Sequence, residues 1–144
     1  MRLKTDYPTT EKDAVNLGAM VAYSKSKTLV FTRALNATSG DVAYTGIGFK
    51  PTALMINATL DNSNNKDFSI GFGDSGLAVN NTAQEWNSLW ATNPGGAAIV
   101  YIDTDGSNKQ VAILKSLDTD GFTLTWTKMG NQAGTISLLT MSWR

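Results

Sequence analysis

The sequence predicts an all-β protein, an antiparallel β-sandwich of jelly-roll type with about eight strands and an N-terminal arm. From residue 28 onward, apolar and polar residues alternate with period two, and Asn, Asp and Gly interrupt the alternation at short intervals. Glu, a strong helix former, occurs only twice in 144 residues, beside many Thr and Asn. No long helical stretch is available to connect parallel strands, so we expect antiparallel pairing.

The alternating stretches predict the strands in chain order. They lie at 28–33, 42–44, 54–60, 68–72, 97–102, 111–117, 122–127 and 135–143. Phe68, Ile70 and Phe72 form the clearest single apolar face, and 97–102 is a continuous apolar run, as expected for a central strand. The predicted core contains Phe31, Leu54, Ile56, Phe68, Ile70, Val100, Ile113, Phe122, Leu124 and Trp126.

Turn-forming residues separate these stretches at 62–65, 74–76, 93–96, 105–106 and 120–121. Asn, Asp and Gly reach positive φ at low cost, so the strands are expected to reverse there. Residues 83–90 depart from this pattern, because Trp86, Leu89 and Trp90 recur at helical spacing and predict a helical turn or an irregular loop. The indoles of Trp86 and Trp90 either close one end of the sandwich or form an aromatic platform for a sugar ring or a partner.

The first part of the chain has a different character. Residues 1–26 lack strand alternation and are predicted to form an arm with a short helix, followed by a sandwich domain at 27–144. Residues 1–33 carry six basic and three acidic groups, whereas residues 34–144 carry six basic and nine acidic groups. We expect the arm to dock on a neighbouring subunit, with basic residues facing acidic surface and apolar residues filling a groove. The docking residues are then Arg2, Lys4, Lys12, Val15, Leu17, Met20 and Val21.

The composition removes several chemistries. The chain has no His and no Cys, which excludes a His-based triad, a thiol nucleophile, a disulfide and a zinc-thiolate site. Its formal net charge of zero gives no overall attraction to nucleic acid or to an anionic membrane. No apolar run reaches the length of a membrane span, and the N-terminus does not have the pattern of a secretory signal. We therefore expect no catalytic site, cofactor, nucleic-acid partner or membrane partner.

The tetrapeptide Asp-Thr-Asp-Gly occurs twice, at 103–106 and 118–121. The first copy resembles the start of an oxygen-rich calcium loop, but such loops end with an acidic residue that is missing from residues 109–114. Both copies are therefore predicted to be turns, and no metal site is expected.

Two stretches resemble structural proteins of tailed bacteriophages. The sequence TGIGFKPTALMI at 45–56 is similar to a strand start common in those proteins. The sequence DGFTLTWTK at 120–128, followed by Gly130 and by Gly-Thr-Ile at 134–136, is similar to their C-terminal hairpin. The two stretches occur in the same order as in the phage proteins.

The resemblance implies a structural component of a phage virion, made in the host bacterial cytoplasm. A head decoration (cement) protein or minor capsid protein that binds neighbouring subunits fits a compact chain without a fibrous shaft. The alternative is a tail-fibre or tail-tip module that binds a cell-surface glycan. Its partners would be other virion proteins. Exposed sheet edges and low surface charge also favour a closed homo-oligomer, for which we expect a trimer.

Overall fold

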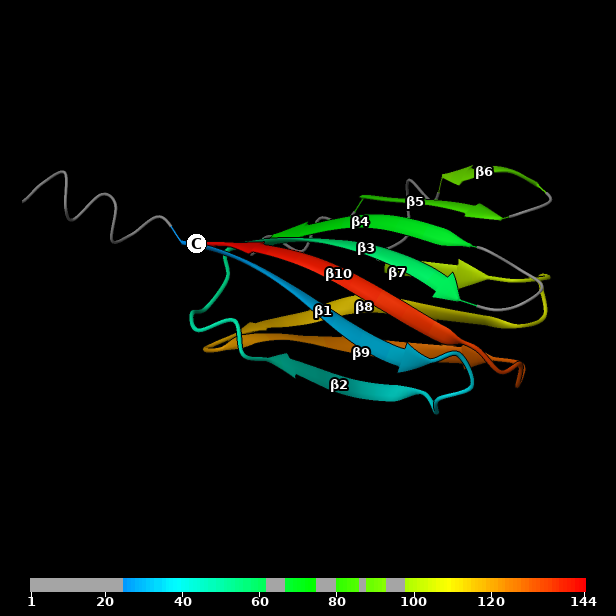
Figure 1. Ribbon diagram of the computed structural model, residues 1–144, viewed down its shortest axis with the longest axis horizontal. Helices are drawn as coiled ribbons and strands as arrows, with labels where there is room; N and C mark the ends of the chain where they lie inside the picture. Colours follow the sequence, from blue (N-terminus) through cyan, green and yellow to red (C-terminus); the bar gives the residue numbers. More distant parts are fainter. Residues whose placement is uncertain (1–24, 62–66, 75–79, 86–87, 93–97) are drawn as a thin grey trace, which may run out of the picture.

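The computed structural model describes residues 25–61, 67–74, 80–85, 88–92 and 98–144. Most of the predicted arm, residues 1–24, lies outside the described residues. The described part contains ten strands (Figure 1): β1 (Ser26–Ala34), β2 (Gly40–Thr45), β3 (Ala53–Asp61), β4 (Phe68–Asp74), β5 (Asn80–Glu85), β6 (Ser88–Thr92), β7 (Ala98–Asp103), β8 (Lys109–Asp118), β9 (Gly121–Met129) and β10 (Thr135–Trp143).

The strands form two antiparallel sheets, so the predicted sandwich is confirmed. One sheet has the order β1-β10-β3-β4-β5-β6 and the other has the order β2-β9-β8-β7. Eight strands make two facing layers of four, and β5 and β6 extend the first layer beyond β4 (Figure 1). The chain crosses between sheets after β1, β2, β6 and β9, whereas β3 to β6 and β7 to β9 run as meanders.

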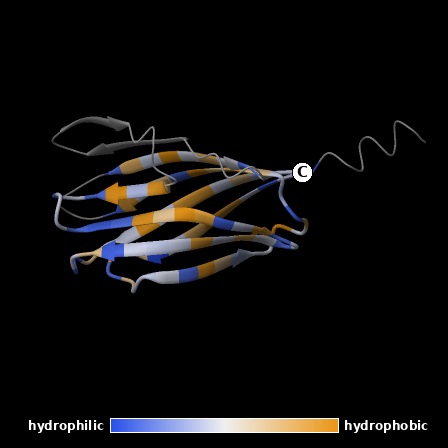
Figure 2. Ribbon diagram, turned by 180° about the vertical axis from the view of Figure 1, so that it is seen from behind, coloured by the Kyte–Doolittle hydropathy of each residue, from blue (hydrophilic) through white to orange (hydrophobic). Residues whose placement is uncertain are grey.

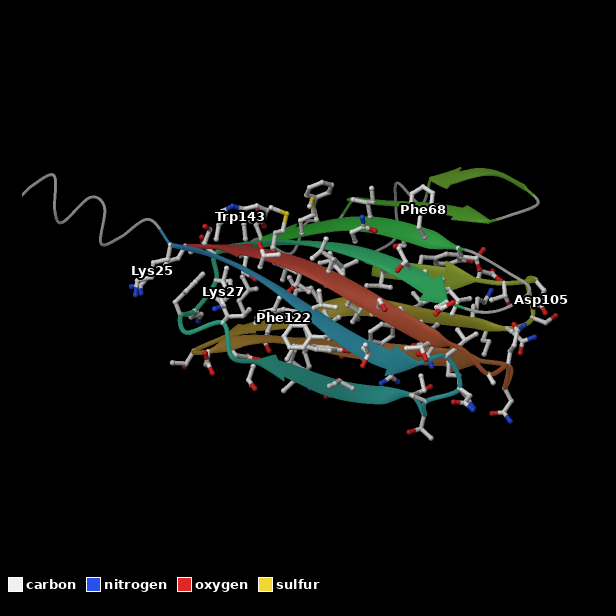
Figure 3. All side chains as sticks on the ribbon, viewed as in Figure 1. Lys25, Lys27, Phe68, Asp105, Phe122 and Trp143 are labelled. Atoms are coloured by element: carbon white, nitrogen blue, oxygen red, sulfur yellow. The ribbon has the colours of Figure 1, made fainter. Side chains whose placement is uncertain are left out.

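The core lies between the two sheets and is built from alternate residues of each strand. Hydrophobic residues concentrate in the strands and hydrophilic residues at the turns (Figure 2). Phe122 lies between the layers in Figure 3, stacked on Tyr44 at a centroid distance of 5.2 Å. Six predicted core residues are buried and Phe31 packs against them, which confirms these predictions: Leu54, Ile56, Val100, Phe122, Leu124 and Trp126.

Three core predictions are wrong, because two strands turn the expected face outward. Phe68 and Ile70 lie on the outer side of β4, whose inward positions are Ser69, Gly71 and Gly73. A Cβ atom on Gly71 would overlap the backbone carbonyl of Ile99 in β7. Because β7 approaches β4 this closely, only very small residues fit inside and the large side chains point outward.

The third wrong prediction is Ile113, which is exposed on β8. The inward positions of this strand are Gln110, Ala112 and Leu114. Gln110 is fully buried, and its side-chain amide donates to the backbone carbonyls of Leu35 and Ala37 at 2.8 and 2.7 Å. The period of two then places Ile113 on the opposite face.

The segment predicted as a helical turn or irregular loop contains strand structure. β5 and β6 pair antiparallel with a register shift between Ala83 and Glu85. Trp86 lies outside the described residues, and of Trp90 only the backbone is described, within β6. The described part of the chain contains no helix with the length and hydropathy of a membrane span.

Candidate functional site

The stretches at 45–56 and 120–136 meet at one end of the sandwich. The Asp120 carboxylate accepts hydrogen bonds from the backbone amides of Gly46, at 3.1 Å, and Gly48. The Asp120 carbonyl also accepts a bond from the Ile47 amide at 3.3 Å. Two backbone amides on either side of Ile47 therefore hold one carboxylate, much as a nest of backbone amides holds an anion. We call this contact between the β2–β3 loop and the β8–β9 turn the loop junction.

Glycines make the loop junction possible. Gly46 and Gly48 have φ values of 94° and 83°, where other residues are strained. Gly121 packs so closely on β2 that a Cβ atom would overlap the Tyr44 carbonyl oxygen. The glycine spacing in both sequence stretches therefore serves a single close contact.

An open pocket of about 730 Å³ lies beside the loop junction. The β2–β3 loop contributes Lys50, β4 contributes Asp74, and the C-terminal residue Arg144 completes the charged lining. Hydroxyl groups come from Thr52, Ser116 and Thr119. Two cations, one carboxylate and several hydroxyls can bind a polar or anionic group by charge and hydrogen bonding. This lining includes no His or Cys, since the chain has neither.

The outer side of the larger sheet carries a broad apolar surface. On β1, β10, β3 and β4, the outward positions include exposed hydrophobic residues with relative exposures of 63% for Val30, 49% for Phe72, 40% for Leu139 and 37% for Trp143. Figure 3 shows Phe68 and Trp143 on this side. We call the following set the outer apolar face: Val30, Met55, Phe68, Ile70, Phe72, Leu139, Met141 and Trp143.

The strand register brings these residues together in rows. One row aligns Met141, Met55 and Phe72, and the next aligns Val30, Leu139, the polar Asn57 and Ile70. The outward positions of these four strands include only two charged residues, Asp61 and Asp74, each at the end of its strand. The middle of the face is therefore uncharged, with its apolar side chains interspersed with Asn57 and with Thr and Ser residues, and it is acidic only at its margins.

The outer side of the smaller sheet is more polar. Lys115 of β8 forms an ion pair with Asp41 of β2. Thr125 of β9 donates to the same carboxylate at 2.6 Å. These hydrogen bonds lower the pKa of Asp41, and the one from Lys115 has the larger effect.

A structural network occupies the end of the sandwich opposite the loop junction. The Arg33 guanidinium lies 4.6 Å from the centre of the Trp126 ring, and it donates to Gln110 at 3.2 Å and to the Thr38 carbonyl at 2.7 Å. Burial lowers the pKa of Arg33. With Gln110 bonded to Leu35, the network fastens the β1–β2 connection to the smaller sheet. Sequence reasoning missed it, because neither Arg33 nor Gln110 belongs to a recognisable motif.

The Asp-Thr-Asp-Gly copy at 103–106 closes the β7–β8 hairpin, as predicted. The Asp105 carboxylate accepts from the amides of Ser107 and Asn108 at 2.9 and 2.7 Å, and Asp103 accepts from Gly106 at 2.7 Å. A side-chain hydrogen bond from Asn108, and then the two backbone bonds, lower the pKa of Asp105. Across the described ranges, no group of three His, Cys, Asp or Glu residues could hold a metal ion.

The structure brings together the stretches at 45–56 and 120–136, but it does not describe the predicted docking residues. Arg2, Lys4, Lys12, Val15, Leu17, Met20 and Val21 lie outside the described residues. The outer apolar face was missed as a site, although the Phe68 to Phe72 alternation was its signal in the sequence. The fold thus defines an antiparallel β-sandwich with an apolar outer face. Comparisons with known protein families, characterised proteins and solved structures found no match.

Proposed function

We propose that this protein is a structural, non-enzymatic component of a tailed-phage virion, in the role of a head decoration (cement) or minor capsid protein. The observation that carries the proposal is the loop junction. The stretches that resemble phage structural proteins are separated by 72 to 74 residues at their hydrogen bonds. Because they form one contact, the resemblance concerns a single piece of folded structure.

The outer apolar face supports the same proposal. An uncharged apolar surface over four strands suits burial against another subunit, since hydrophobic burial drives association and no like charges oppose it. A decoration protein acts by adding buried area across subunit boundaries and needs no reactive groups. The proposed partners are other virion proteins, and the proposed assembly is a homotrimer on the virion without nucleic-acid or membrane contact.

The test is to locate the protein in intact particles of the phage that encodes it. A cryo-electron microscopy map, with antibody labelling to identify the density, should place regularly spaced copies on the head shell. Copies at the tail tip, together with binding to host-surface glycans, would favour the tail module instead. Purified particles without the protein would overturn both proposals.

A further inference from the structure

We propose that the outer apolar face is the docking surface for the N-terminal arm of a second copy of this chain, with residues 14–21 as its occupant. The inference rests on the subunit assembly in the proposed function and names the two surfaces that make the contact. Each copy would give one arm and receive one. Such a head-to-tail exchange closes into a ring when the rotation between copies permits.

The face is suited to an uncharged occupant. Val30, Leu139 and Phe72 are exposed on neighbouring rows, and charged outward residues occur only at the strand ends Asp61 and Asp74. A charged segment would lose solvation on the middle of this surface without meeting an opposite charge. An apolar segment would bury these side chains at a gain of about 25 cal/mol per Å².

The chain outside the structure contains a segment that matches. Residues 14–21 read AVNLGAMV, with six apolar residues and no charge. Within residues 1–24, all charged residues precede this stretch: Arg2, Lys4 and Lys12 are basic, and Asp6, Glu11 and Asp13 are acidic. The three basic and three acidic side chains balance, so the match with the face rests on the neutral stretch.

The length of the segment is sufficient. Eight residues extend to at most about 26 Å. Four strands spaced about 4.8 Å apart place β1 and β4 within about 15 Å of each other. The segment can therefore cross all four strands that carry the face.

The place where the arm joins the sheet favours a neighbouring copy. Arg144 and Lys25 continue the β1–β10 pairing, with the Arg144 amide donating to the Lys25 carbonyl at 2.9 Å. Lys25 lies at the end of the sheet, where β1 begins (Figure 3). A chain that continues the β1 direction therefore leaves past the sheet end. Docking of residues 14–21 on their own face would need residues 22–24 to reverse the chain, whereas a neighbouring copy beyond the sheet end can be reached without a reversal.

The absence of cysteine from the chain gives a direct test. A full-length Met20→Cys chain and a full-length Leu139→Cys chain, one of them tagged to change its mass, are mixed and oxidised mildly. Docking raises the effective concentration of the two thiols from about 10 µM to about 1 mM, so we expect about a hundredfold more mixed disulfide dimer than from unassisted encounter. The matched control replaces Leu139→Cys by Thr127→Cys, an exposed position on the outer side of the smaller sheet.

A second measurement guards against a disulfide that fails for geometric reasons. Leu139→Lys should convert the oligomer to a folded monomer by light scattering and circular dichroism, whereas Thr127→Lys should leave it unchanged. A disulfide that forms only within one chain carrying both cysteines would show that the arm covers its own face, and would overturn the proposal. A full-length chain that is monomeric and gives no mixed disulfide would also overturn it.

These outcomes are separate from those of the proposed function. Arm exchange by a protein that is missing from phage particles would overturn the virion role alone. A protein found on the head shell that shows no exchange would overturn the docking inference alone.

Discussion

β4 and β9 have the same alternating pattern in sequence but opposite orientations in the fold. Each carries three large apolar residues at alternate positions. In β9 these point into the core, whereas in β4 they point away from it. The two sets are Phe122, Leu124 and Trp126 in β9, and Phe68, Ile70 and Phe72 in β4.

The difference comes from the residues between the large ones. In β9 the intervening positions are Thr123, Thr125 and Thr127, which tolerate partial exposure. In β4 they are a serine and two glycines, and Ser69 accepts a hydrogen bond from the Tyr101 amide of β7 at 3.0 Å. Direct backbone contact with β7 requires the small side to face inward. The size of the alternate residues therefore indicates when an apolar face is turned outward.

The largest expected effect is the difference in the free energy of unfolding between a substitution on the inward side of β9 and one on the outward side of β4. Trp126→Ala should cost about 3–5 kcal/mol, because it leaves a cavity in the core. It also removes the hydrogen bond to the Tyr44 hydroxyl at 3.1 Å and the stacking surface under Arg33. Phe72→Ala, on the half-exposed side of β4, should stay within about 1 kcal/mol in the monomer. Urea unfolding measures both free-energy changes, provided that the m-value stays constant. Equal losses in the two variants would refute the assignment of Trp126 to the core and of Phe72 to the outer side.

The second effect concerns the small side of β4. Gly71→Ala places a methyl group where the Ile99 carbonyl lies, so β4 and β7 must separate. We expect a loss of about 1–3 kcal/mol, as in overpacked cores. The control is Thr59→Ala, on the outer side of the neighbouring strand β3. Thermal unfolding that leaves Gly71→Ala as stable as the control would show that β7 does not approach β4 in solution.

Local pattern was sufficient to predict most of the fold. Strands, turns and the burial of Trp126 followed from alternation and turn residues, since these depend on near neighbours. The outward faces of β4 and β8 did not, because they depend on contacts with distant residues: Gly71 with Ile99, and Gln110 with Leu35 and Ala37.

The candidate site was predictable in part for the same reason. Both halves of the loop junction were visible as sequence stretches. The hydrogen bonds from the glycine amides to Asp120 were not, because β3 to β8 lie between the partners in the sequence. The outer apolar face was visible as alternation and was assigned to the wrong side. Side-chain size at the intervening positions 69, 71 and 73 was the signal that could have corrected it.

The third effect tests the loop junction. Asp120→Ala leaves the Gly46 and Gly48 amides without their acceptor, and hydrogen bonds to a charged group contribute about 1.5–3 kcal/mol when shielded from water. Because this junction is exposed, we expect a loss of about 1 kcal/mol. Asp120→Asn keeps one acceptor oxygen and should lose less stability than Asp120→Ala. Hydrogen exchange at Gly46 and Gly48 should accelerate in both variants, and unchanged exchange would contradict the capping role.

The smallest expected effect is the pH dependence of stability that comes from Asp41 on the outer side of the smaller sheet. The pKa of Asp41 is lowered by its hydrogen bonds, first from Lys115 and then from Thr125, so folding favours the ionised form. The resulting stabilisation is present above the ordinary carboxyl pKa of 3.8 and is lost as the pH falls below it toward the lower folded value. Asp41→Asn should therefore flatten the acid side of the stability profile and leave most of the stability at neutral pH, because the carboxylate is exposed and screened.

Thr125→Val removes the lesser donor and should flatten the profile less than Asp41→Asn does. Urea midpoints measured between about pH 2.5 and pH 7 give the slope of stability against pH. The lower limit extends about one unit below the ordinary carboxyl pKa. An Asp41→Asn profile parallel to the parent would show that this polar face holds no ordered ion pair. The outer sides of the two sheets would then differ in residue type but not in ion pairing.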